Sequence, residues 1–250
     1  MNSIDNPFYS GTSGLVLPVP QSLYPTEFQD KSRLEYYASL FNSVEINSSF
    51  YKMPMISTVS KWAESVGDHF QFTFKLSKII THVKGLDFNV EDIELFMQRI
   101  ENIRNKKGCL LVQFPPSLKI ENISRVEQLL FNLKKADENQ LWKVAIEFRD
   151  QSWYHDEVYD LLNTYKTAMV IHDLPASATH LFKTKSEFMY IRFHGPDGRY
   201  RGSYSDEFLS QYADYIKKGM KEGKGVYIYF NNTMGDAIKN LQTLNGFLQT

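Results

Sequence analysis

Eight short segments with the character of β-strands occur along this 250-residue chain, and helical segments separate nearly all of them. Strands that alternate with helices favour parallel pairing through right-handed crossovers. Eight such units in a chain of this length predict an α/β fold, a TIM-type (β/α)8 barrel that forms a single domain over residues 1–250. The alternative is an open doubly wound sheet, but no GxGxxG motif follows an early strand to favour it.

The expected strands share short apolar or alternating runs, and they lie at 8–14, 44–47, 70–76, 110–114, 144–149, 168–173, 189–194 and 226–231. The expected helices carry apolar residues at helical spacing, and they lie at 31–41, 55–66, 89–104, 123–135, 156–165, 206–220 and 236–248. The segment between the sixth and seventh strands has no strong helical pattern and is expected to be a loop.

Composition excludes several classes of protein. A net charge of −1 argues against a protein that coats nucleic acid by bulk electrostatics. The single cysteine, Cys109, rules out a disulfide framework, and its apolar neighbours predict a buried, inert thiol. The chain start has no basic region followed by an apolar one, and no run is long enough to span a bilayer. We therefore expect a cytoplasmic protein with no membrane partner.

Polar residues occupy alternate positions in seven of the expected strands. In a parallel barrel the outward face of each strand packs on helices, so apolar residues are assigned outward and polar residues inward. Val44 and Ile46 thus face outward, and Glu45 and Asn47 face inward. The polar residues assigned inward by this rule are Glu45, Asn47, Thr73, Lys75, Gln113, Glu147, Arg149, His172, Arg192, His194, Tyr229 and Asn231.

The strand ends predict one polar site at the carboxyl-terminal mouth of the barrel. Seven residues are expected to line a single cavity there: Glu45, Lys75, Gln113, Glu147, Arg149, Arg192 and His194. Glu45, Glu147 and His194 are the candidate catalytic residues, and His194 is the best placed for proton transfer. A structural ion pair explains Glu147 and Arg149 equally well. No metal is expected, because no ligand pair has the required spacing and the inward cations would repel one.

Six motifs occur in a fixed order along the chain: VEINSSFYKMP, FTFKLSKIITH, LVQFPPSL, IEFRDQSW, YIRFHG and YIYFNNTMGDAIKN. In this order they resemble the YecE-like proteins, the domain-of-unknown-function family 72, over about residues 10–248. The resemblance implies a TIM-type barrel, and a distant likeness of that family to endonuclease IV barrels is an analogy of fold only. It supplies no reaction and no cofactor. The residues of interest that it implies are Glu45, Asn47, Tyr51, Lys75, His82, Gln113, Glu147, Arg149, Trp153, Arg192, His194, Asn231 and Asn232.

One position departs from the pattern of that family. Its members usually carry a tryptophan soon after the first Gly-Thr-Ser-Gly, where this chain has Leu15-Val16-Leu17. Any ligand contact from the first βα-loop is therefore in doubt. Among the other implied residues, Tyr51 and Trp153 are interpreted as rim packing, with a stacking platform as the alternative. His82 fits a solvated loop position, and Asn232 fits a helix cap.

The loop at 195–204 carries Arg199 and Arg201 together with glycines and tyrosines. Loops after the last strands of such barrels often hold phosphate, and arginine suits phosphate oxygens. The first hypothesis is therefore a protein that binds a phosphate-bearing small molecule or nucleic acid through Arg192, with help from Lys75 and Arg149, and that hydrolyses a phosphoester. The second is a non-catalytic nucleotide or nucleic-acid binder, and the third is a sugar or small-acid enzyme with a pair of glutamates. A solvated loop explains 195–204 equally well, and the sequence does not give the oligomeric state.

Overall fold

The structure, a computed structural model, describes residues 7–179 and 186–249. Its strands form two parallel sheets. The first has the order β1 (Phe8–Thr12), β9 (Gly225–Phe230), β8 (Phe188–Phe193) and β7 (Ile171–His172). The second has the order β2 (Ser43–Ile46), β3 (Gln71–Lys75), β4 (Lys107–Gln113), β5 (Lys143–Glu147) and β6 (Ala168–Met169). Every predicted strand is present, although the sixth is divided into β6 and β7.

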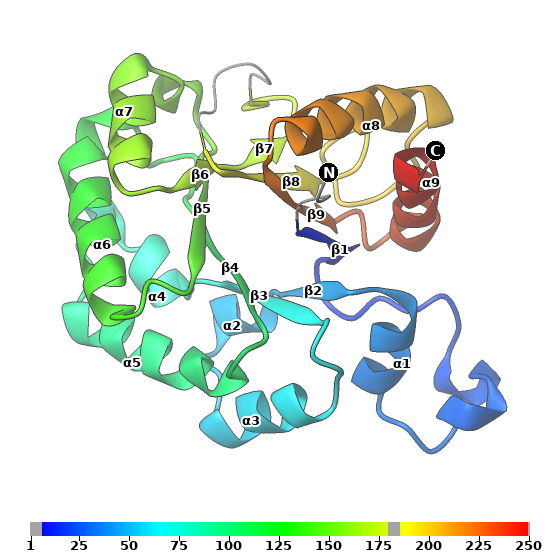
Figure 1. The fold of residues 1–250 in the computed structure, drawn as a ribbon. Helices are drawn as coiled ribbons and strands as arrows, with labels where there is room; N and C mark the ends of the chain where they lie inside the picture. The colour runs from blue at the N-terminus through cyan, green and yellow to red at the C-terminus, as the bar shows by residue number, and fades with distance from the viewer. Residues whose placement is uncertain (1–6, 180–185, 250) are drawn as a thin grey trace.

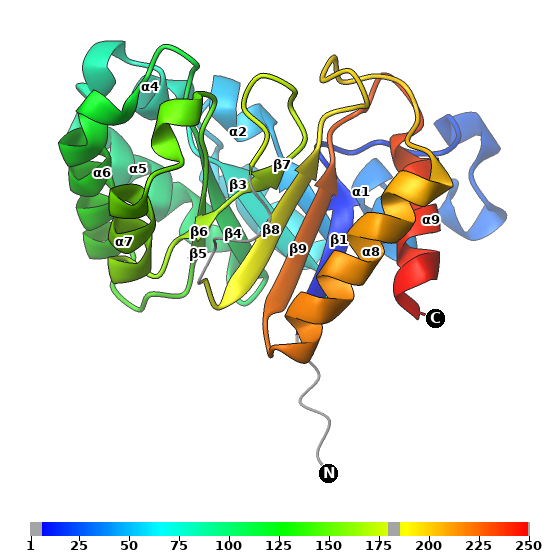
Figure 2. The ribbon, with the colours of Figure 1, turned by 90° about the horizontal axis from the view of Figure 1, so that it is seen from above.

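Helices lie around the outside of the strands (Figure 1). All seven predicted helices are present: α1 (Arg33–Leu40), α3 (Ile56–Glu64), α5 (Val90–Ile100), α6 (Ile123–Ala136), α7 (Asp156–Thr164), α8 (Asp206–Lys221) and α9 (Ala237–Gln249). Two four-residue helices were not predicted, α2 (Ser48–Tyr51) and α4 (Lys78–Thr81), because a single turn has no periodicity to detect. Both follow the carboxyl ends of strands, at the upper side of Figure 2. Single 3-10 turns lie at Gln21–Leu23, Thr26–Phe28, Lys84–Leu86, Glu101–Ile103, Ile120–Asn122 and Gln151–Trp153.

The two sheets meet at both of their edges. Val170 is the only residue between β6 and β7, and its N–H donates to Ile146 O at 2.8 Å, so the chain passes directly from one sheet to the other. At the opposite edges, Ser13 and Glu45 form an isolated parallel bridge. There the side chain of Asn42 bonds to the backbone of β1, accepting from Ser10 N at 2.9 Å. The predicted α/β fold with parallel strands is thus confirmed, whereas β1 and β2 are joined by isolated contacts and not by a continuous ladder.

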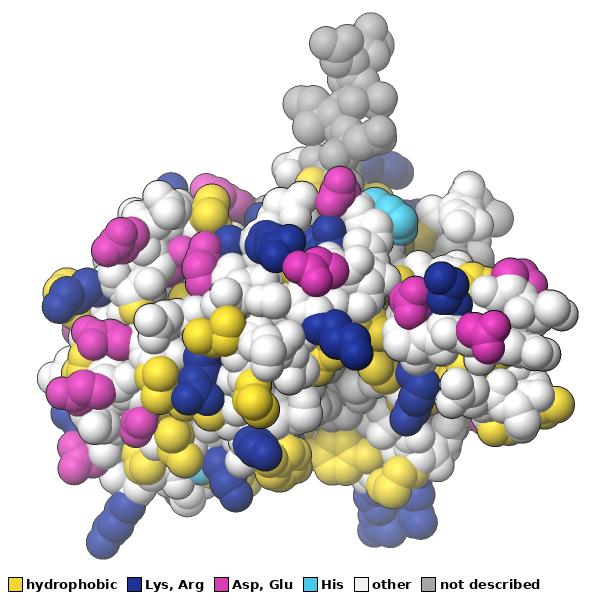
Figure 3. All heavy atoms as spheres, turned by 90° about the horizontal axis from the view of Figure 1, so that it is seen from below, with side chains coloured by type: hydrophobic (Ala, Val, Ile, Leu, Met, Phe, Trp, Pro, Cys, Tyr) yellow, Lys and Arg dark blue, Asp and Glu magenta, His cyan; other side chains and the backbone are white. Residues whose placement is uncertain are grey.

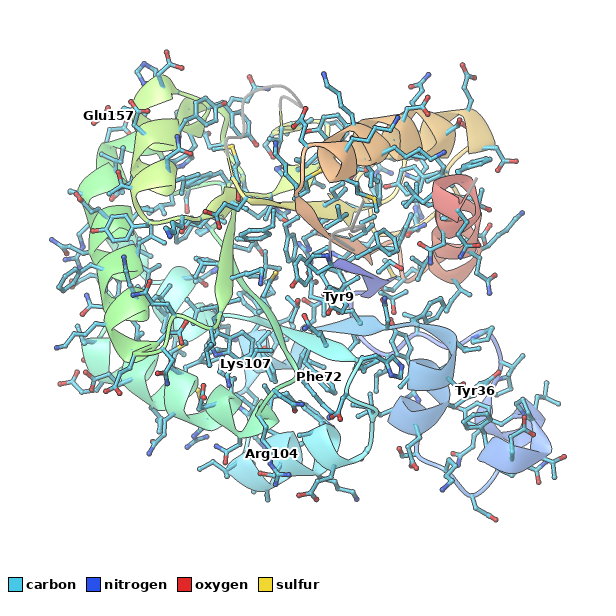
Figure 4. All side chains as sticks on the ribbon, in the orientation of Figure 1. Tyr9, Tyr36, Phe72, Arg104, Lys107 and Glu157 are labelled. Carbon is cyan, nitrogen blue, oxygen red and sulfur yellow. The ribbon has the colours of Figure 1, made fainter. Side chains whose placement is uncertain are left out.

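Two separate apolar clusters bear out the assignment of strand faces. The outer cluster joins the helices to the strand residues assigned outward, such as Val44 and Phe72. The inner cluster contains Cys109, Leu111, Ala145, Ala168, Val170, Phe188, Tyr190, Tyr227 and Tyr229. Figure 4 labels one residue of each environment: Phe72 of β3, which stacks on Trp62 of α3, and Tyr9 of β1, which stacks on Tyr227 of β9. Burial raises the pKa of Cys109 well above its ordinary value, which agrees with an inert thiol.

Acidic and basic side chains are interspersed on the face seen in Figure 3, as the near-zero net charge leads one to expect. Over residues 7–179 and 186–249, no helix is both long and apolar enough to cross a membrane.

Candidate functional site

The guanidinium of Arg192, on β8, joins two buried glutamates from distant strands. Its Nε and Nη2 donate to the Glu45 carboxylate on β2 at 2.9 and 2.7 Å. Its Nη1 donates to Glu147 Oε2 on β5 at 2.6 Å. Glu45 and Glu147 are fully buried and Arg192 is 1% exposed. We call these three residues the buried triad, and it lies where the inward positions of three strands converge.

Two members of the buried triad, Glu147 and Arg192, are held in their charged forms. Burial disfavours the charged form of a carboxyl group and of a guanidinium alike. The positive charges of Arg149 and then of Arg192 nevertheless hold the pKa of Glu147 well below its ordinary value. The two glutamates in turn raise the pKa of Arg192, although its own burial opposes this. Glu45 also accepts from Ser13 Oγ and from the hydroxyl of Tyr190, each at 2.6 Å. These bonds leave few oxygen lone pairs in the triad without a donor, which is the condition for tolerating buried charge.

His194 lies beside the triad with both ring nitrogens engaged. Its Nδ1 is 3.3 Å from Asp173 Oδ1, and its Nε2 is 3.2 Å from Arg192 Nη1 and 3.6 Å from Glu147 Oε1. Asp173 also accepts from the backbone N–H of His194 at 2.8 Å and from the hydroxyl of Tyr204. His194 is fully buried, so the structure holds its imidazole in a fixed orientation. A ligand could reach this ring only after a neighbouring side chain moves.

Lys75 ends β3 and differs from the other inward cations because it has no carboxylate partner among the residues that the structure describes. Its ammonium lies 4.1 Å from the centre of the Phe50 ring, a cation–π contact with α2. Burial, and then the charge of Arg192, lower the pKa of Lys75 to about 8. Arg149, by contrast, donates to Glu147 Oε1 and directs Nη1 toward Tyr200 Oη at 3.5 Å.

The two short helices build the rim beside Lys75. The ring of His82, which follows α4, packs edge-on against Phe50 at 4.9 Å between centroids. Its Nδ1 is 2.9 Å from Thr81 Oγ1. Partial burial, followed by the charges of Lys75 and Arg149, lowers the pKa of His82 to about 4. His82 was predicted as a solvated loop residue, and its side chain is exposed; one edge of its ring nevertheless packs on the same Phe50 ring that contacts the Lys75 ammonium.

The other predicted site residues lie at the edge of this cluster or outside it. Gln113 pairs in register with Glu147 and donates to Phe114 O at 2.7 Å. Asn47 is the residue before α2, and its buried Oδ1 accepts no hydrogen bond from the described protein atoms. Asn231 is half-buried just after β9, with its N–H donating to Phe193 O. Arg199 and Arg201 are exposed in the loop after β8.

Two assignments require correction. Trp153 is fully buried, stacks on Phe148 at 4.4 Å and donates Nε1–H to Leu118 O at 2.8 Å, so it packs the outer core and offers no platform to a ligand. Arg192 was expected to be the main anion contact, but its guanidinium is already bound to both glutamates. Tyr51 does lie at the rim, 70% exposed, with its ring edge-on to Phe50 at 5.0 Å.

Sequence reasoning missed several residues that complete the cluster. Asp173 and Tyr190 hydrogen-bond to members of the site, and Phe50 covers Lys75. The parity rule would have found Tyr190, which lies two residues before Arg192 on the same strand face. Nothing in the sequence links Tyr204 to Asp173. Over residues 7–179 and 186–249, no group of three or more His, Cys, Asp or Glu side chains is placed to hold a metal ion.

Solved structures with the same fold span nearly the whole chain. A DUF72 family protein from Thermotoga maritima MSB8 aligns with a TM-score of 0.80 at 26% identity, covering 98% of this chain and 100% of its own. One from Enterococcus faecalis V583 has a TM-score of 0.80 at 21% identity, covering 97% and 96%. A xylose isomerase domain containing protein from Salmonella typhimurium LT2 shares the fold more distantly, with a TM-score of 0.52, 11% identity and 100% of both chains covered.

Sequence comparison identifies the same group. UPF0759 protein YunF of Bacillus subtilis (strain 168) is 28% identical over 252 residues, which is 88% of this chain and 87% of YunF. UPF0759 protein YecE of Escherichia coli (strain K12) is 33% identical over 82 residues, 33% of this chain and 30% of YecE. The family model described as "Protein of unknown function DUF72" matches residues 9–250. This chain therefore belongs to the DUF72 family.

Proposed function

We propose that the carboxyl ends of the strands bind the phosphate group of a small molecule or nucleic acid, with Lys75 and Arg149 as its cationic contacts. The observation that carries the proposal is the Lys75 ammonium, which is half-buried and forms no ion pair with any described carboxylate. A desolvated cation without a counterion is unfavourable in the free protein. An anion bound there would supply the missing charge through charge-assisted hydrogen bonds.

The distribution of charge supports Lys75 and Arg149 rather than Arg192 as the contacts. The buried triad contains two carboxylates and one guanidinium, and Arg149 neutralises the remaining negative charge through Glu147. Lys75 then adds one positive charge to a neutral set. His82 feels the positive charge of both Lys75 and Arg149, so these three side chains lie within electrostatic range of one another. The exposed Arg199 and Arg201 are available to extend the site toward a larger ligand.

The geometry favours binding over the reactions considered from sequence. A glycosidase needs one carboxyl group that is free to protonate the leaving group, whereas Glu45 and Glu147 both accept hydrogen bonds from the same buried arginine. Phosphoester hydrolysis needs a proton donor or acceptor at the ligand, and His194 is buried with both nitrogens occupied. A non-catalytic nucleotide or nucleic-acid binder therefore agrees better with the arrangement than a hydrolase does.

The proposal also concerns the arrangement of the two sheets on which the site lies. We infer that the two sheets are halves of one (β/α)8 barrel in a single domain. The Ser13–Glu45 bridge and the direct passage through Val170 support this inference, because both join the sheets at their edges. Gly11 of β1 also supports this inference. A Cβ at that position would overlap the carbonyl oxygen of Ser43 in β2, so the two strands approach closely where the sheets meet. In such a barrel the ligand would meet Lys75 from the side of α2 and α4.

Isothermal titration calorimetry tests the proposal with inorganic phosphate, adenosine monophosphate and a short single-stranded oligonucleotide. Lys75→Gln should weaken binding by about tenfold to a hundredfold, the value of one charge-assisted hydrogen bond. Lys61→Gln, on the exposed surface of α3, is the matched control and should bind like the wild type. The proposal fails if the wild type binds none of the three ligands, or if Lys75→Gln binds as tightly as Lys61→Gln.

A further inference from the structure

We propose that Lys75 is a nucleophile that forms an imine with the carbonyl group of an aldehyde or ketone that also carries a phosphate group. The phosphate half of this inference rests on the proposed function, with Arg149 as the contact that remains when Lys75 reacts. The carbonyl half rests on the surroundings of Lys75 itself. It narrows the ligand from any phosphate-bearing molecule to the class of phosphorylated carbonyl compounds.

The backbone of Lys75 is fixed, so its side chain alone sets the position of the amine. Lys75 pairs with Leu111 across the β3–β4 ladder, and its carbonyl accepts from Ser49 Oγ at 2.7 Å. The amine rests against the Phe50 ring rather than against an acid. An ion-paired lysine would have to break its pair before reacting, whereas this one has no such bond to a described carboxylate. The geometry therefore presents an amine whose lone pair becomes available on loss of a single proton.

The environment makes that proton loss accessible near neutral pH. A lysine attacks a carbonyl carbon only as the neutral amine. With its pKa at about 8, roughly one-tenth of Lys75 is neutral at pH 7, against about 0.03% of an ordinary lysine at 10.5. The neutral amine is thus enriched about 300-fold. Lower basicity weakens the nucleophile in part, so we expect a net advantage of at least about tenfold over an exposed lysine.

The reaction is balanced without an oxidant or a cofactor. The neutral Nζ donates its electron pair to the carbonyl carbon, and the carbonyl oxygen takes up a proton to give a carbinolamine. The nitrogen, which has given one of its two protons to that oxygen, loses the other as the C–O bond breaks, so that the hydroxyl group leaves as one molecule of water and a C=N bond remains. His82 contacts the same Phe50 ring, but with its pKa lowered to about 4 it is too weak a base to hold the proton released from Lys75, which passes to water instead.

Reductive trapping followed by peptide mass spectrometry tests the inference. The intact protein is incubated at pH 7 with glycolaldehyde phosphate or with glycolaldehyde, in the presence of cyanoborohydride, and the modified lysines are located. We expect the phosphorylated compound to modify Lys75 at least tenfold faster than Lys61, with a rate that rises with pH to a midpoint near 8. Lys75→Arg keeps the positive charge but cannot form an imine, so its remaining adducts should match the background level.

The two reagents separate this inference from the proposed function. If both reagents modify Lys75 faster than Lys61, and at equal rates, Lys75 is a nucleophile but the phosphate group makes no contact with the protein, so the binding proposal is overturned. Phosphate binding in the calorimeter with no preference for Lys75 over Lys61 would overturn the nucleophile and leave the binding proposal standing. If Lys75 shows no preference and phosphate does not bind, both proposals are wrong.

Discussion

Replacing Lys75 with methionine should stabilise this protein at neutral pH, although the change removes a polar group from the candidate site. The side chain is half-buried beside the Phe50 ring, and no described carboxylate forms an ion pair with it. Methionine keeps a flexible chain of similar length in contact with that ring and removes the charge. Most core substitutions destabilise, so a gain here would identify Lys75 as a residue kept at a cost in stability.

The size of the effect follows from the pKa of Lys75, which falls from an ordinary 10.5 to about 8. Each unit corresponds to about 1.4 kcal/mol, so the charged form is disfavoured in the native state by about 3 kcal/mol. The unfolded chain binds its proton more tightly than the native state does, and the penalty applies in full below pH 8. As the pH rises from 8 toward 10.5, native Lys75 has already lost its proton, and the penalty disappears.

Urea unfolding followed by circular dichroism measures this effect at pH 7 and at pH 9.5. Lys75→Met should exceed the wild type in unfolding free energy by up to about 3 kcal/mol at pH 7, and by clearly less at pH 9.5. Lys61→Met, on the exposed face of α3, should change stability by less than about 0.5 kcal/mol at both values. A loss of stability in Lys75→Met at pH 7 would refute the reasoning, because it would mean that the ammonium has a favourable partner.

Three further predictions concern stability. Glu147→Gln should lower the unfolding free energy by about 3–5 kcal/mol, because it leaves the buried Arg192 and the partly buried Arg149 without their shared carboxylate; a loss below about 1 kcal/mol in denaturant unfolding would contradict this. Burial lowers the pKa of His172 to about 4, so its ring should stay neutral down to about pH 4 in a proton NMR titration. The protein should also lose stability as the pH falls from 6.5 to 4, because the unfolded chain takes up this proton at a higher pH than the native state does. A ring that titrates near 6.5 would contradict the prediction. Gly11→Ala should lower the free energy of unfolding by about 1–3 kcal/mol, since a Cβ would overlap the carbonyl oxygen of Ser43. The control Gly246→Ala in α9, where a Cβ meets nothing, should be neutral or stabilising. Similar melting temperatures for the two variants would count against the close approach of β1 and β2.

The inward positions of the site could be predicted because strand geometry alone decides them. Once β2, β5 and β8 are recognised, alternation places Glu45, Glu147 and Arg192 on one face. Their pairing could not be predicted, since Arg192 meets a glutamate 147 residues away on one side and another 45 residues away on the other. Counting charges suggested Arg192 as the main anion contact, with help from Lys75 and Arg149, whereas distances show that of these three only Lys75 lacks a described carboxylate partner.

The rim was harder to predict than the strands. Trp153 follows a strand end and was interpreted as rim packing, with a stacking platform as the alternative, but its 3-10 turn directs the indole into the outer core. Phe50 lies in a one-turn helix that leaves no periodic signal, although it covers Lys75 and His82. Short segments after strands are positioned by tertiary contacts, so their side-chain directions do not follow from local sequence.

The strand order also determines when the chain can complete its sheets during synthesis. Strands β2 to β6 follow one another in sequence and pair with their immediate successors, so this sheet can assemble as each strand leaves the ribosome. Strand β1 is made first, yet its ladder partner is β9, in which Phe8 pairs with Val226. The first strand must therefore remain without its backbone partner until almost the entire chain has been made. A ribosome-bound chain that ends before β9 would expose the edge of β1, and this step closes the longest loop in the fold.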